Sequence, residues 1–97
     1  MNNMEYDGLP APCVEESTIS SLLDRLTYSY DVQGTSTFCH AFLDGRFYLA
    51  TGHSACVAPE NYDNEIGHGL ARDKAYKAAT DKLWELEGYV LYKKLAV

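Results

Sequence analysis

A row of small side chains along one predicted helix constrains the fold of this chain more than any other feature. The segment NEIGHGLARDKAYKAATDKLWELEG, residues 64–88, carries small and apolar residues at helical spacing. The stripe consists of Gly67, Ala71, Ala75, Ala78, Lys82, Leu83 and Leu86. Because glycine and alanine let a helix backbone approach a sheet closely, the stripe predicts a helix lying directly on a β-sheet. Leu83, Trp84 and Leu86 should fill the wider end of that contact.

The two ends of this helix are marked differently. Pro59 suits a first helical turn and Asn61 or Asp63 suits a cap, so we expect the helix to begin between residues 59 and 64. Gly88 interrupts or caps it, and residues 89–97 either resume the helix or pair as an edge segment.

The segment before this helix is rich in β-branched and aromatic residues. Three runs, 27–32, 35–43 and 46–57, are separated by Gln33-Gly34 and Asp44-Gly45, which predicts three strands of an antiparallel meander. A short amphipathic helix is expected over residues 14–26, where leucine and isoleucine recur every three or four positions. The predicted fold is therefore α+β, with the order α-β-β-β-α and helices covering a three-stranded antiparallel sheet. Residues 1–13 are expected to be a flexible N-terminal arm and residues 14–97 a single domain.

The turn at Asp44-Gly45 leaves two registers open. A two-residue turn places Leu43 opposite Arg46 and puts one set of residues on the buried face: Phe38, Phe42, Phe47 and Leu49, with His40 and His53. A three-residue turn that includes Arg46 slips the register by one residue. It brings Leu43, Ala41, Leu49 and Phe47 together instead.

Composition excludes several classes of protein. With 97 residues, a two-domain enzyme is nearly excluded, and 46% hydrophobic residues are enough for a core. The net charge of −6 opposes general attraction to phosphates or anionic lipid. No apolar run approaches the ~20 residues of a membrane span and the start lacks a signal-peptide pattern, so we expect no membrane association. Three cysteines without a CxxC pair favour a reducing compartment.

The densest polar cluster precedes the long helix, in APENYDNEIGHG. Carboxylates and amides at a strand-to-helix turn can bind a polar ligand, a cation or a partner, or act as a general base. The same residues can equally cap the helix and complement its dipole. The candidate binding residues are Glu60, Asn61, Tyr62, Asp63, Glu65 and His68. Their spacing does not match a calcium-binding loop.

No assembled catalytic or metal-binding set is evident. Cys39 and His40 are adjacent on a strand and point to opposite faces, so they do not join His53 and Cys56 around one zinc ion. Glycine-rich nucleotide-binding motifs are missing too. We therefore expect no catalytic residues, no metal and no cofactor.

The long helix and tail form the only basic stretch, with a balance of +2 for residues 66–97 against −8 for residues 1–65. The element order and the basic, alanine-rich helix resemble a double-stranded-RNA-binding domain, in which a lysine cluster on the last helix holds phosphates. Arg72, Lys74 and Lys77 would carry that role here. Asp73 interrupts the cluster, so nucleic acid is not the partner we expect.

The segment of residues 37–91 is similar to a family of small tailed-phage proteins, named after gene product forty-nine of an N-four-type coliphage and gene sixty-six of a Shigella phage, and the resemblance covers about residues 17–95. A Thr-rich strand ending in Cys39 and the motif Gly-x-Ser-Ala-Cys-Val over residues 52–57 open the resemblance. Pro-x-Asn-Tyr-Asp-x-Glu-Ile-Gly over 59–67 and Lys-Leu-Trp-x-Leu-Glu-Gly-Tyr over 82–89 complete it. His68 and Gly69 stand at positions that are often basic in relatives.

The resemblance implies a phage accessory protein in the host cytoplasm, with no catalytic activity to carry over. We therefore expect a non-enzymatic binder that inhibits or modulates a host or anti-phage defence protein through residues 60–65 and nearby aromatic side chains. A nucleic-acid-binding module and a small metal-dependent enzyme are the alternatives. Eight tyrosines and Trp84 are also compatible with a homo-oligomer surface.

Overall fold

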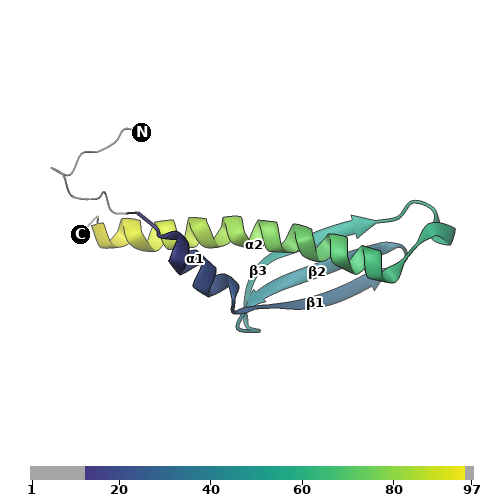
Figure 1. Ribbon diagram of the computed structural model, residues 1–97, viewed down its shortest axis with the longest axis horizontal. Helices are drawn as coiled ribbons and strands as arrows, with labels where there is room; N and C mark the ends of the chain where they lie inside the picture. Colours follow the sequence, from purple (N-terminus) through teal and green to yellow (C-terminus); the bar gives the residue numbers. More distant parts are fainter. Residues whose placement is uncertain (1–12, 96–97) are drawn as a thin grey trace.

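The chain folds into one helix, three strands and a second, much longer helix, as the computed structural model of residues 13–95 shows (Figure 1). Helix α1 spans Glu16–Leu23, strands β1, β2 and β3 span Leu26–Gln33, Ser36–Leu43 and Phe47–Ala55, and a 3-10 turn, η1, spans Pro59–Asn61. Helix α2 runs over Asn64–Leu95. The predicted α+β class and the order α-β-β-β-α are confirmed. The arm expected over residues 1–13 lies, except for Cys13, outside the described residues.

Helix α2 lies directly on β3, and the contact depends on the small residues of both elements. Ala71, Ala75, Ala79 and Leu83 are the buried residues of α2 and recur every fourth position. Opposite them is Gly52 of β3, where a Cβ would come within 2.1 Å of the Ala71 carbonyl oxygen and 2.4 Å of the Ala75 nitrogen. The predicted close packing of helix on sheet is confirmed, although Ala79 takes the buried place expected for Ala78.

The strands pair in the order β1-β2-β3, and the β2–β3 turn sets the register at their connected ends. Leu43 pairs with Phe47 across a three-residue turn, in which Asp44 and Gly45 both have positive φ. The two-residue turn is therefore wrong and the three-residue alternative is correct. The register then shifts again between Ala41 and Phe42, because β3 contains one extra residue.

The two one-residue shifts cancel over most of β2 and β3, so Phe38, His40 and His53 still share one face, as predicted, but α2 covers the other face of the sheet. Thr37, Cys39 and Ala41 face α2 and are fully buried, whereas Phe38, His40 and Phe42 are on the opposite face and remain half-buried. Of the residues predicted as the buried set, only Leu49 is buried, and Phe47 is 54% exposed.

The opposite face of the sheet carries no helix within residues 13–95. Its side chains pair with one another across the strands instead. Phe38 stacks on His53 at a ring distance of 4.5 Å, and Phe42 meets Tyr48 edge-on at 5.7 Å. Thr51 Oγ1 bonds His40 Nδ1 at 2.8 Å and the Tyr48 hydroxyl at 2.7 Å.

Helix α1 is shorter than the predicted 14–26, because the chain turns at Asp24 and Arg25 and Leu26 starts β1. Arg25 then clamps the β2–β3 turn by a two-point ion pair with Asp44, with Nε–Oδ1 and Nη2–Oδ2 distances of 3.0 and 2.5 Å. The hydrogen bond and the charge of Arg25 lower the pKa of the Asp44 carboxyl below its ordinary value. The Asp44 amide also donates to the Arg25 carbonyl oxygen at 3.0 Å.

Helix α2 continues well past the sheet. Gly88 neither interrupts nor caps it, which settles the two alternatives for the C-terminal segment in favour of helix as far as Leu95. At 1.5 Å per residue, 32 residues make a helix of about 48 Å. Its first half lies over the sheet, and its second half extends beyond the sheet with α1 alongside (Figure 1).

The helix–sheet contact can be tested by replacing Gly52 with alanine. A Cβ at this position overlaps backbone atoms that cannot move aside, so Gly52→Ala should lower the free energy of unfolding by at least about 2 kcal/mol. Gly69→Ala is the matched control, because a Cβ there meets nothing within 4 Å and alanine favours a helix by up to about 1 kcal/mol. Urea unfolding compares the two. Equal stability for both variants would contradict the proposed packing.

Candidate functional site

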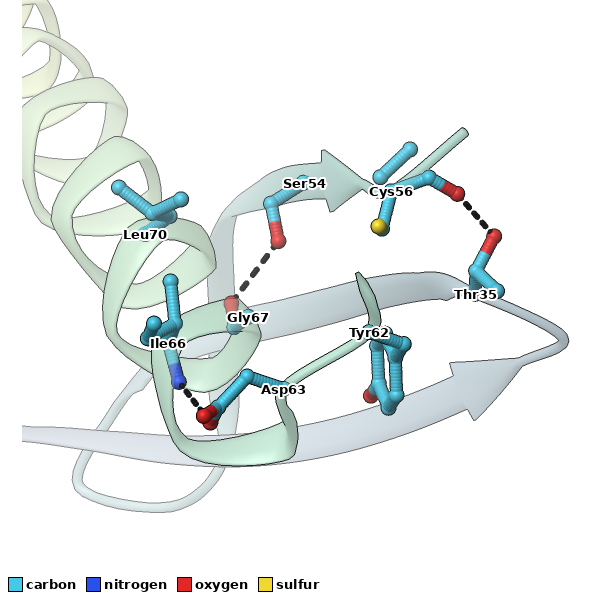
Figure 2. Close-up of a pocket in the computed structure, with 9 residues that line it drawn as sticks. Thr35, Ser54, Cys56, Tyr62, Asp63, Ile66, Gly67 and Leu70 are labelled. Atoms are coloured by element: carbon cyan, nitrogen blue, oxygen red, sulfur yellow. Dashed lines mark hydrogen bonds between the residues drawn. The ribbon is translucent and has the colours of Figure 1, made fainter. Parts of the chain in front are cut away.

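A cavity of about 220 Å³ opens where the end of β3 meets the start of α2. Its walls come from four separate parts of the chain: the turn before β2, the end of β3, the residues after η1 and the first two turns of α2 (Figure 2). The lining residues are Thr35, Ser54, Ala55, Cys56, Tyr62, Asp63, Ile66, Gly67 and Leu70. We refer to them together as the tip cavity.

Backbone and side-chain hydrogen bonds fix one wall of the tip cavity. The Cys56 amide donates to the Thr35 carbonyl oxygen at 3.0 Å, and the Thr35 hydroxyl donates back to the Cys56 carbonyl oxygen at 2.5 Å. The Cys56 thiol donates to the Ala58 carbonyl oxygen at 3.1 Å. This wall is therefore held in place by groups that already have partners.

A second set of hydrogen bonds joins the sheet to the first turn of α2. Ser54 Oγ donates to the Gly67 carbonyl oxygen at 2.9 Å (Figure 2). The Tyr62 hydroxyl lies 3.2 Å from Thr37 Oγ1 and donates to Asn64 Oδ1 at 3.1 Å. A Cβ at Gly67 would come within 2.9 Å of Thr37 Oγ1, so a glycine is needed for this approach.

Asp63 caps α2. Its Oδ1 accepts hydrogen bonds from the Glu65 and Ile66 amides at 3.0 and 3.1 Å (Figure 2). These amides belong to the first turn of the helix and have no partner within it. The capping alternative thus holds for Asp63, although the same residue also lines the cavity.

The structure separates the other candidate binding residues. Tyr62 lines the cavity, whereas Glu60 and Glu65 are exposed on η1 and on the first turn of α2. His68 packs on Tyr30 of β1 at a ring distance of 4.4 Å and bonds the Asn64 carbonyl oxygen through Nδ1 at 2.8 Å, so it serves the helix–sheet contact. The side chain of Asn61 lies outside the described part of the chain.

The exposed apolar residues at this end of the molecule, of which Ile66 and Leu70 line the cavity, are not among the predicted site residues. Val57 is 98% exposed, Ile66 61% and Leu70 51%. Ile66 and Leu70 are four residues apart in α2, beside the Gly67–Ala71 positions that face the sheet. An apolar i, i+4 pair outside the buried stripe was the available signal.

The structure also shows where the residues considered for a zinc site lie. Cys39 faces α2 and His40 the open sheet face, as expected from their adjacency, and within residues 13–95 no three His, Cys, Asp or Glu side chains are placed to share a metal.

The basic residues of α2 point in different directions. Lys74 Nζ donates to the His53 carbonyl oxygen of β3 at 3.0 Å. Burial raises the pKa of Tyr28 on β1, and the nearby Arg72 guanidinium opposes that shift. Arg72 therefore lies toward β1 and Lys74 toward β3, so these two cations flank α2 on different sides.

A comparison with known families decides the identity at family level. The model of the phage protein (N4 Gp49/phage Sf6 gene 66) family matches residues 14–95. The chain belongs to this phage protein family. The resemblance drawn from its motifs is thus confirmed, and most residues lining the tip cavity of this phage protein are also residues that carry it. No match was found among curated proteins or among solved structures. Between Cys13 and Leu95, no helix of the phage protein has the length and apolar character needed to cross a membrane.

Removing the Asp63 side chain should destabilise the phage protein without affecting the fold. Asp63→Ala leaves two first-turn amides without their acceptor, and loss of such a cap costs about 1 kcal/mol. Thermal unfolding measures the change. Glu60→Ala is the control, since Glu60 is exposed and should shift stability by less than about 0.5 kcal/mol. If the two substitutions were equivalent, Asp63 would not be the cap.

The three thiols of the phage protein should react at different rates. Cys13 is exposed, Cys56 is half-buried at the cavity and Cys39 is fully buried. Burial raises the pKa of the Cys39 thiol, which lowers the fraction of reactive thiolate. Timed alkylation with mass spectrometry should modify Cys13 first, Cys56 more slowly and Cys39 only on unfolding. Early modification of Cys39 would contradict the described packing.

Proposed function

We propose that this phage protein is a non-enzymatic binder that acts in the host cytoplasm and inhibits or modulates a host or anti-phage defence protein. Membership of a phage protein family supports a role during infection. The partner-binding surface would be the end of the molecule at which β3 leads into α2.

One observation carries the proposal: exposed apolar side chains surround a cavity within an acidic surface. Val57, Ile66 and Leu70 expose large apolar groups at this end of the molecule. Glu60, Asp63 and Glu65 are exposed beside them. We call this set the acidic tip, and it comprises Val57, Glu60, Asp63, Glu65, Ile66 and Leu70. An apolar centre with a charged rim is the usual composition of a protein-binding surface.

The charges of the acidic tip indicate the chemistry of the partner. Residues 1–65 carry a balance of −8, and residues 60–65 contribute three acids and no base. A partner with a basic surface around an apolar side chain would be attracted from a distance and then seat that side chain in the cavity.

The polar groups around the cavity already have hydrogen-bond partners, which supports a binding role more than a catalytic one. Asp63 is used as a helix cap, Ser54 donates to a backbone carbonyl, and the Tyr62 hydroxyl bonds two side chains. Across residues 13–95, every buried side-chain nitrogen or oxygen has a hydrogen-bond partner. Groups held in this way give the surface a fixed shape, which favours recognition of a partner.

The proposal is tested by affinity capture from host cells, in which the wild-type protein is compared with a variant substituted at the acidic tip. The wild-type protein should retain a specific host or defence protein, and Ile66→Arg with Glu65→Gln should reduce the retained amount about tenfold, because it removes an apolar contact and a charge. Asp63 is left unchanged, since its loss would weaken the helix.

Asp81→Asn serves as the matched control, because Asp81 is also an exposed acid on α2 but lies about three turns beyond Leu70. It should retain the partner at the wild-type level. Both variants should unfold at nearly the wild-type temperature. Failure of the wild type to retain any specific protein, or undiminished retention by the tip variant, would rule the proposal out.

A further inference from the structure

The second half of α2 exposes large apolar residues, although α1 and the residues just before it lie along one side of this half. Beyond Leu86, which packs against the core, Tyr89 is 60% exposed, Val90 44%, Tyr92 64% and Leu95 58%. An exposed row of this kind indicates an interaction surface.

Part of this surface forms a continuous stripe along α2. The stripe consists of Trp84, Gly88, Leu91 and Leu95, spaced by four, three and four residues, so its members lie on one side of the helix. Trp84 is 37% exposed, and a Cβ built on Gly88 meets nothing within 4 Å. The glycine at the centre therefore leaves room for a second helix to approach closely, between the large side chains of Trp84 and Leu91.

The charges beside the stripe identify the partner helix. Asp81, Glu85 and Glu87 make the earlier turns acidic, and Lys94 places a positive charge beside the stripe in the last turn. Lys93 is on the opposite side of the helix, 5.9 Å from the centre of the Tyr89 ring. The ion pair found in residues 13–95 joins Arg25 to Asp44, so the acids and lysines of α2 have no ion-pair partner within that part. Two copies of this segment in antiparallel orientation would place acidic turns against basic ones, whereas a parallel pair would place like charges together.

We propose that two copies of the protein associate through an antiparallel contact between the C-terminal halves of their α2 helices. The stripe of Trp84, Gly88, Leu91 and Leu95 forms the apolar seam. Glu87 and Lys94, seven residues apart on the same side of α2, meet Lys94 and Glu87 of the other copy. The contact is self-complementary, as a two-fold symmetric dimer requires.

This dimer does not rest on the proposed function, because its surface is at the opposite end of α2 from the acidic tip (Figure 1). Light scattering and sedimentation over a wide range of protein concentration test it directly. The full-length wild type should be a dimer that dissociates on dilution.

Gly88→Arg is the decisive variant. It places a long charged side chain in the middle of the seam, where the monomer has open space, so the variant should fold normally and remain a monomer. Gly69→Arg is the matched control: Gly69 is also a glycine of α2 with nothing within 4 Å of its Cβ, but it lies on the first half of the helix. This control should remain a dimer.

A charge exchange tests the antiparallel orientation. Glu87→Lys should weaken the dimer about tenfold, because two attractive pairs become repulsive, and adding Lys94→Glu should restore most of the affinity. A wild type that stays monomeric at all concentrations, a Gly88→Arg variant that still dimerises, or a charge exchange that fails to restore the dimer would each overturn the proposal.

Discussion

The close approach of Gly52 to the backbone of α2 is the interaction on which the rest of the structure depends. No side chain separates β3 from the helix at this point, and the facing residues of α2 are the alanines at positions 71 and 75. The helix therefore lies against the strand instead of resting on a layer of large residues. This contact fixes the direction of α2 and, with it, the position of its first turn over the end of β3. The tip cavity lies between that first turn and the end of β3 at Ala55 and Cys56.

The sequence predicted the elements and their order well because the strongest signals were local. The alanine stripe, the three β-rich runs and Pro59 each mark structure within a few residues. The register of β2 and β3 could not be predicted, since it contains two one-residue shifts. One is the three-residue turn at Asp44, which Arg25 stabilises from the connection between α1 and β1, and the other is the extra residue in β3. The buried face could not be predicted either, because apolar residues are nearly equal on the two faces of β2 and do not indicate which face α2 covers.

Only part of the candidate site was predicted, because local sequence signals mark its contiguous segment and not the residues that come from elsewhere in the chain. The acidic segment at residues 60–65 is contiguous and visible in the sequence, but the cavity beside it combines Thr35, Ser54 and Leu70 from distant segments. The capping role of Asp63 could be anticipated from its place before a helix, and the structure shows how the same carboxylate shapes the cavity rim. His68 illustrates the opposite case. Although it is close to the acidic segment in sequence, the helix turns it toward Tyr30 and the sheet.

Helix α2 also determines how far apart the two ends of the molecule are. A continuous helix without proline or a break is stiff, and its 32 residues set a separation of about 48 Å between the cavity at its first turn and the lysines at its last. A protein bound at one end of the helix and a protein bound at the other would therefore be held at a fixed distance. This distance is too great for side chains of the two proteins to contact each other. Changing the number of helical turns after Leu83 would alter that distance, and the rotation between the two ends, while leaving the sheet and its cavity unchanged.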